Sequence, residues 1–103
     1  MQESEFQALV DEVFMDIEDR IDEQEADVDV ENAGGVLTLT FDDGSQVILS
    51  RQTATREIWV AARSGGFHLQ LVKDDWVCGT TDELLSQLVN RVVVEQGGVS
   101  LFD

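Results

Sequence analysis

The sequence predicts an α+β fold: a two-layer α-β sandwich whose N- and C-terminal helices pack on one face of an antiparallel sheet of about six strands. Three observations support this prediction. Apolar residues recur at helical spacing at both ends of the chain, they alternate with polar residues in between, and short turns rich in glycine and aspartate separate the alternating runs. The length of 103 residues is typical of one domain, which we expect to span residues 1–103.

The first predicted helix begins at Ser4, a good N-cap residue, and Gln7 completes a capping box. Apolar side chains then repeat every three or four residues from Phe6 to Ile21. At roughly 100° per residue, the opposite face is almost wholly anionic. Its carboxylates repel one another four residues apart, which lowers helix stability. They are Asp11, Glu12, Asp16, Glu18, Asp19, Asp22 and Glu23.

After Gln24 the apolar period changes from about 3.6 to 2 residues, which predicts strands. In the first, Val28 and Val30 alternate with acids. Asp43-Gly44 lies between two alternating runs and predicts a hairpin, because both residue types tolerate positive φ. Short connections of this kind make neighbouring strands antiparallel. Further strands are expected at 36–41, 46–50, 57–61, 66–71 and 76–78.

A second helix is predicted after Thr80, which we expect to cap it, with Glu83 completing a capping box. The Gly97-Gly98 pair ends this helix, and a short apolar tail follows. Packing both helices on one face of the sheet leaves the other face to solvent, a common two-layer solution. The apolar stripe of the second helix comprises Leu84, Leu85, Leu88, Val89 and Val92.

Negative charge is concentrated at the start of the chain. Thirteen of the 22 acidic residues lie within the first 31 positions, where Arg20 is the only base. This asymmetry indicates a surface that attracts cations or a basic partner. The net charge of −16 argues against nucleic acid and anionic membranes, since both are polyanions. Without an apolar run of ~20 residues or a basic-then-apolar leader, we expect a cytoplasmic protein that does not bind membranes.

The acids of the first helix are expected to form one ridge with those that follow it: Glu25, Asp27, Asp29 and Glu31. Hard cations prefer oxygen ligands, and carboxylates without a cage bind them weakly, at several labile sites. The alternative is a solvated surface that only keeps the protein soluble. A calcium-binding EF-hand loop is excluded, because Asn32 and Thr38 stand where the glycine and the bidentate glutamate are required.

Catalytic chemistry has little support in this sequence. Cys78 is the only cysteine, so neither an internal disulfide nor a cysteine-based zinc site is expected, and its apolar surroundings predict a buried structural thiol. His68 is predicted to face solvent beside Gln70. Glycine-rich phosphate loops and the common hydrolase motifs are absent. We therefore expect a protein that is not an enzyme.

Trp59 is predicted to face outward, because its neighbours Ile58 and Val60 suit the core side of a strand. An exposed tryptophan with Arg51 and Gln52 nearby in sequence is typical of a protein-binding hot spot. The alternative is a tryptophan covered by the preceding loop, residues 51–56.

Several separate motifs, in the correct order, resemble the bacterial frataxins, the CyaY family. The resemblance runs from Ser4 to the C-terminal tail, so it covers nearly the whole chain. Departures occur at Ser50, Ala54 and Glu57, where the family usually has Asn, Pro and Gln. The motifs are the acidic run 18–31, Gly34-Gly35-Val36-Leu37-Thr38-Leu39-Thr40-Phe41, Gly44-Ser45, Arg51-Gln52, Ile58-Trp59, Gly65-Gly66-Phe67-His68 and Trp76-Val77-Cys78.

The resemblance implies a frataxin-like sandwich and an accessory role in iron–sulfur cluster assembly. Members of the family bind ferrous and ferric iron weakly on the acidic ridge and contact the cysteine desulfurase and the scaffold protein. The implied iron ligands, which we also expect to bind other divalent cations, are Asp11, Glu12, Asp16, Glu18, Asp19, Asp22, Glu23, Glu25, Asp27, Asp29 and Glu31. The implied partner-binding residues are Glu18, Asp19, Asp22, Glu23, Arg51, Gln52 and Trp59.

Two matters stay open from the sequence. We expect mostly monomers, and oligomers that form only with iron are a further alternative. The competing functional hypothesis is an acidic interaction module that regulates a basic partner without a metal role. Such a module would bind its partner through the ridge but would show no site-specific titration with iron.

Overall fold

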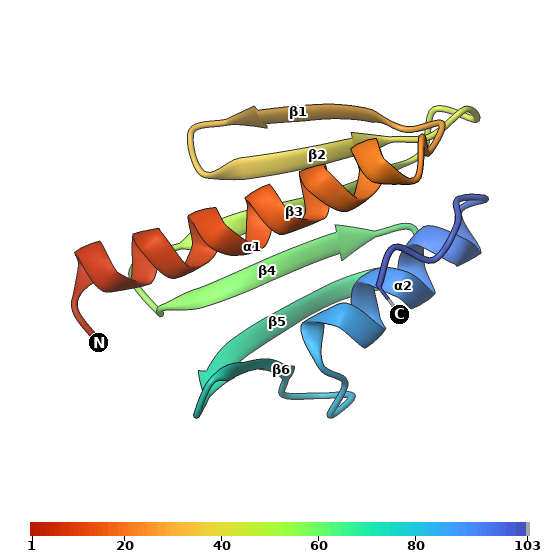
Figure 1. Ribbon diagram of the computed structural model, residues 1–103. Coiled ribbons are helices and arrows are strands. Elements are labelled where there is room, and N and C mark those ends of the chain that lie inside the picture. Colours follow the sequence, from red (N-terminus) through yellow and green to blue (C-terminus); the bar gives the residue numbers. More distant parts are fainter. Residues whose placement is uncertain (103) are drawn as a thin grey trace.

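The computed structural model describes residues 1–102 and confirms the predicted α-β sandwich (Figure 1). Residue 103, the last of the predicted domain, lies outside the described residues. Six strands form one sheet in the order β1-β2-β3-β4-β5-β6, with antiparallel neighbours throughout. Both helices cover the same face of this sheet (Figure 1). The elements are α1 (Glu3–Glu23), β1 (Asp29–Ala33), β2 (Val36–Thr40), β3 (Gln46–Gln52), β4 (Glu57–Ala62), β5 (Gly65–Val72), β6 (Asp75–Cys78) and α2 (Leu85–Glu95).

Helix α1 packs its predicted apolar stripe into the core and turns its acids outward. It begins at Glu3, with Gln2 at the N-cap and no capping hydrogen bond from a side chain, so the predicted capping box at Ser4 was wrong. Glu3 and Glu5 lie in the first turn, where negative charge interacts favourably with the helix dipole. The buried residues of α1 are Phe6, Val10, Phe14, Ile17 and Ile21.

Alternate side chains of the inner strands enter the core, as the period of two predicts. The residues between them face the open side of the sheet, away from the helices. Strand β1 differs, because all five of its residues are exposed and it forms an edge of the sheet. The buried strand residues include Leu37, Leu39, Val47, Leu49, Ile58, Val60 and Leu69.

Helix α2 begins later than predicted, so the expected cap at Thr80 was wrong. The backbone N–H of Cys78 donates to the carbonyl of Glu83, and Val77 and Leu84 form a β-bridge, which holds the intervening residues as a loop beside β6. The helix therefore starts at Leu85. No helix among residues 1–102 is long and apolar enough to cross a membrane.

The end of α2 is tied to the sheet by Gln96, which is only 6% exposed. Its side-chain oxygen accepts from the Arg63 N–H at 3.0 Å, and its nitrogen donates to Ser45 Oγ at 2.9 Å and to the Gln46 carbonyl at 3.2 Å. One side chain thus joins α2 to two turns of the sheet. Gly97 follows with a φ of 95°, the left-handed conformation that ends many helices.

The C-terminal tail contacts both helices. Leu101 is buried, and Asn90 accepts hydrogen bonds from the backbone N–H groups of Leu101 and Phe102, both at 2.9 Å. Gln24, the C-cap residue of α1, donates to the Leu101 carbonyl at 3.0 Å. The Arg20 guanidinium of α1 lies 4.4 Å from the centre of the Phe102 ring. The tail therefore fastens α1 to α2.

Replacing Gln96 with Ala is expected to lower the free energy of unfolding by roughly 1–3 kcal/mol, because buried backbone groups lose their partners. Urea unfolding followed by circular dichroism measures this change. The matched control is Val94→Ala, an exposed position of the same helix, where a change within about 0.5 kcal/mol is expected. Equal effects of the two substitutions would contradict the role given to Gln96.

Candidate acidic site

A groove of about 480 Å3 runs between the C-terminal half of α1 and strand β1. Its floor includes Ile21 and Val28, and its carboxylates come from both elements. Asn32 of β1 donates to Glu18 Oε1 at 2.7 Å, a contact that joins one carboxylate of the groove to the strand. We call this feature the acidic groove; its carboxylate residues are Glu18, Asp19, Asp22, Glu25 and Asp29.

The acidic groove lacks compensating charge. Among residues 1–102, none of its five carboxylates lies within 4.0 Å of a lysine or arginine nitrogen. The nearest base along α1, Arg20, turns away and pairs with Asp16 at 2.9 Å. Negative charge that neighbours leave uncompensated creates a field that attracts cations and basic surfaces.

The other predicted ligands of α1 lie outside the groove. Asp16 pairs with Arg20 on the side of the helix that meets the C-terminal tail. Asp11 lies 3.7 Å from Arg51 Nη1 near the start of the helix. Glu12 and Glu23 are exposed and are not among the residues that line the groove.

Strand β1 divides the predicted ridge. Asp29 and Glu31 pair in register with Thr40 and Thr38, which neighbour core residues and so face the open side of the sheet. Asp29 lines both the acidic groove and a second hollow on the open face, whereas Glu31 lines only the open face. The strand acids therefore extend the negative field around the edge instead of completing one continuous row.

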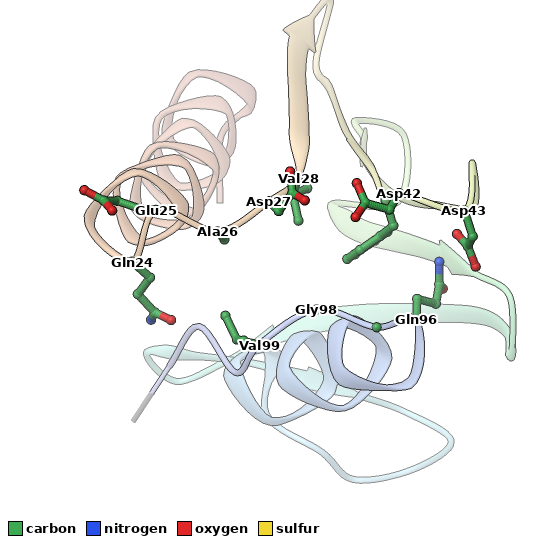
Figure 2. A pocket seen from close by; sticks show the side chains of 12 residues that line it. Gln24, Glu25, Ala26, Asp27, Val28, Asp42, Asp43, Gln96, Gly98 and Val99 are labelled. Carbon is green, nitrogen blue, oxygen red and sulfur yellow. The ribbon is translucent and has the colours of Figure 1, made fainter.

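A second cleft of about 460 Å3 lies where the α1–β1 connection meets the β2–β3 turn and the end of α2. Figure 2 shows Asp27 and Asp42 close together beside it, with Gln96 nearer to Asp43. Hydrogen bonding to Asp27 and the charge of that residue raise the pKa of Asp42. Sequence reasoning missed Asp42 and Asp43, which it assigned only to a hairpin turn. Extending the β1–β2 register from Asp29↔Thr40 by two residues would have placed Asp42 opposite Asp27.

The described carboxylates do not form a ready-made metal cage. Within residues 1–102, no group of three or more His, Cys, Asp or Glu side chains is arranged to hold a metal ion. The acidic groove can supply single or paired oxygen ligands and a negative field. Such a surface suits weak coordination of hydrated hard cations.

Trp59 lies on the open face of the sheet, 36% exposed, as the sequence predicts. Its ring stacks on that of His68 with a centroid distance of 4.3 Å and an interplanar angle of 6°. Its indole Nε1–H donates to Glu57 Oε1 at 2.9 Å, and Gln70 Nε2 donates to Glu57 Oε2 at 3.2 Å. His68 is exposed, as predicted, but its stacking on Trp59 was not expected from the sequence.

Arg51 and Gln52 do not join Trp59 in one cluster. Arg51 contacts Asp11 of α1 and packs against Gly35, so its side chain lies on the helix-covered side of the sheet. Gln52 faces the open side and donates to Ser50 Oγ at 3.1 Å. These three of the seven predicted partner-binding residues are thus divided between the two faces of the sheet.

Cys78 is fully buried at the end of β6, which confirms a thiol enclosed by the fold. Burial raises the pKa of this thiol, but hydrogen bonds from Thr80 and Thr81 outweigh that effect and lower it to about 7. The Sγ atom lies 3.4 Å from Thr80 Oγ1. Because the thiol has no exposed surface, the folded protein does not offer it to reagents in solution.

Comparison with known proteins settles the family. The sequence model of the Frataxin-like domain matches residues 1–99. The chain belongs to the frataxin family. Its frataxin relatives include a protein of Stutzerimonas stutzeri named iron-sulfur cluster assembly protein CyaY, 50% identical over 103 residues, which are 98% of this chain and 94% of that protein. A protein of the same name from Vibrio atlanticus is 51% identical over 91 residues, 88% of each chain.

Solved structures agree with this frataxin assignment. Frataxin from Psychromonas ingrahamii superimposes with a TM-score of 0.92 over 100% of both chains, at 28% sequence identity. Trimeric frataxin from the yeast Saccharomyces cerevisiae matches with a TM-score of 0.70, covering 93% of this chain and 86% of that one, at 21% identity. The second likeness shows that the fold persists at low identity.

Asp42 and Asp43 are expected to titrate on opposite sides of the ordinary value of 3.8. Asp27 raises the pKa of Asp42, whereas hydrogen bonds from Ser45, together with Arg63, lower the pKa of Asp43 to about 2. Asp43 therefore contributes stability above its unfolded pKa, and this is lost as the pH falls toward 2. Asp42 contributes stability below 3.8, which is lost as the pH rises through its raised pKa.

Carboxyl-carbon NMR across the acid range measures both titrations in one sample. In the Asp27→Asn variant the midpoint of Asp42 should move down, while that of Asp43 should stay in place. Coincident midpoints for the two residues in the unmodified protein would contradict this account.

Proposed function

We propose that this protein is an iron-binding accessory protein of iron–sulfur cluster assembly. It binds ferrous and ferric iron weakly through its surface carboxylates and docks on the cysteine desulfurase and the scaffold protein. The observation that carries this proposal is the acidic groove, where five carboxylates from α1, its following turn and β1 lie without a basic partner among residues 1–102. The names of the curated frataxin relatives support the assembly role.

Iron is held as cargo in this proposal, not as a resident cofactor. Glu18, Asp22 and Asp29 present oxygen atoms, which suit hard cations and also accept other divalent ions. Weak, exposed coordination leaves much of the hydration shell in place, so that the ion is released readily. Asp16 and Asp11 contribute less to iron binding than the sequence pattern implies, because each carboxylate must first break its ion pair with an arginine.

The same surface is proposed to dock a basic patch of the desulfurase. Long-range attraction steers such an encounter and weakens as salt rises, because exposed charges are screened. If iron and desulfurase share the acidic groove, each changes the affinity of the other by the same factor. We propose a cytoplasmic, mostly monomeric protein without enzymatic activity, on which any iron oxidation is incidental.

An acidic interaction module without a metal role is the second candidate. The observation that favours it is the lack of a preformed group of three metal-binding side chains within residues 1–102. It shares the docking of a basic partner with the first proposal but predicts no coordination of iron at particular carboxylates.

Reversing the charge of three groove residues, Glu18→Lys, Asp19→Lys and Asp22→Lys, is expected to weaken desulfurase and ferrous iron binding together. Partner affinity should fall by more than about 10-fold, because placing like charges together costs several kcal/mol. Anaerobic NMR titration with ferrous iron at two salt concentrations, and calorimetry with the desulfurase, measure the two effects.

The matched control makes the same change of net charge elsewhere, through Asp74→Lys, Asp75→Lys and Glu95→Lys. This control variant should retain site-specific binding of ferrous iron and of the desulfurase. Line broadening along α1 and β1 that survives added salt supports iron coordination. If broadening is diffuse and vanishes with salt while desulfurase still binds, the interaction module is correct and the iron proposal is wrong.

Trp59→Ala is expected to weaken scaffold binding by about 2 kcal/mol or more, the loss that defines a binding hot spot. The affinity for iron should equal that of the unmodified chain within experimental error, because Trp59 lies on the face of the sheet opposite to α1. Calorimetry with the scaffold protein and the iron titration above give the two readouts. Scaffold binding that does not change would remove Trp59 from the proposed interface.

A further inference from the structure

The indole of Trp59 is held in place by neighbours on its own face of the sheet, although over a third of the residue is exposed. Exposed side chains normally exchange rotamers on the ps–ns timescale. Here the ring of the cross-strand partner His68 stacks on the indole, with a centroid distance of 4.3 Å and an interplanar angle of 6°. One ring face and the only polar atom of the indole are therefore both engaged.

Glu57 is the second restraint and joins two strands. One carboxylate oxygen accepts the Trp59 indole N–H at 2.9 Å, and the other accepts from Gln70 of β5 at 3.2 Å. The hydrogen bond from Trp59 is also the largest cause that lowers the pKa of Glu57, a carboxylate that is ionised at neutral pH. A charged acceptor makes a stronger hydrogen bond than a neutral one.

The restrained rings border a small hollow of about 140 Å3 on the open face. Ile48 and Phe67 line it together with the smaller residues Ser50, Ala61 and Gly66. The stacked pair therefore lies beside a hollow that is open to solvent. Tryptophan is enriched among binding hot spots, and a side chain that is already restrained loses little rotamer entropy on binding.

We propose that Glu57 and His68 are positioning residues that fix the indole of Trp59 in its binding orientation before the scaffold protein arrives. This inference rests on the docking role proposed above for Trp59. Glu57 acts through the indole N–H, and His68 acts through the ring face. Neither residue needs to contact the partner for its loss to weaken binding.

The first test uses the isolated protein and NMR relaxation of the Trp59 indole N–H, assigned with Trp59→Phe. In the unmodified chain, its ¹⁵N heteronuclear NOE should approach that of Trp76, which is buried in the core. Glu57→Ala and His68→Ala should each lower it. Glu57→Gln should restore it, because the amide oxygen still accepts the indole N–H. Asp75→Ala, an exposed acid of neighbouring β6, is the control and should change nothing.

The second test measures scaffold affinity for the same variants. Glu57→Ala and His68→Ala should each weaken it by roughly 2- to 10-fold, the cost of immobilising one mobile side chain. Glu57→Gln and Asp75→Ala should retain the affinity of the unmodified chain. Loss of affinity in Glu57→Gln equal to that in Glu57→Ala would mean a direct charge contact with the partner and would overturn the positioning role.

An indole that stays rigid in both alanine variants would also overturn the proposal, as would an indole that becomes mobile with no change in scaffold affinity. Failure of the proposed docking role has a different signature. In that case Trp59→Ala binds the scaffold as tightly as the unmodified chain does, while the relaxation data still report whether Glu57 and His68 restrain the ring.

Discussion

The antiparallel register of the sheet is the constraint on which both proposed binding surfaces depend. Each strand pairs with its sequence neighbour, so short turns fix which side chains meet. The β4–β5 register sets Trp59 opposite His68. The β1–β2 register turns Asp29 and Glu31 to the open face and leaves Asn32 free to reach Glu18. A shift of one residue in either hairpin would exchange the two faces and remove these contacts.

The acidic face of α1 persists because the apolar face of that helix outweighs it. Five side chains of α1 are buried, and complete burial of such a side chain contributes about 1.5–3 kcal/mol. Repulsion between like charges four residues apart costs only ~0.2–0.5 kcal/mol for each pair. Residues such as Phe14 and Ile17 thus hold the helix on the sheet while Asp22 and its neighbours stay uncompensated. The tail adds to this attachment through Asn90 and Leu101.

Most of the fold could be predicted from periodicity, because helices and strands bury apolar residues at different spacings. The helix starts were the weak point. Thr80 has the chemistry of a cap, but a β-bridge and a hydrogen bond to Cys78 hold the following loop against β6, and local sequence does not reveal such tertiary contacts. Exposure of Trp59 followed from alternation alone. Predicting which side chains contact the site residues also requires the pairing register of the strands. For this reason Asp42 and the stacking of His68 on Trp59 were missed. The separation of Arg51 from Trp59 was not expected either.

The exposed edge formed by β1 also affects association between copies of the protein. It is a wholly exposed edge, and unpaired edges of this kind favour strand addition between copies of a protein. The opposite edge, β6, is only four residues long and is bridged by Leu84. Asp29 and Glu31 place two negative charges on the β1 edge, and like charges disfavour the pairing of two such edges. Under the iron binding proposed above, a cation held at these carboxylates would reduce that repulsion and favour self-association.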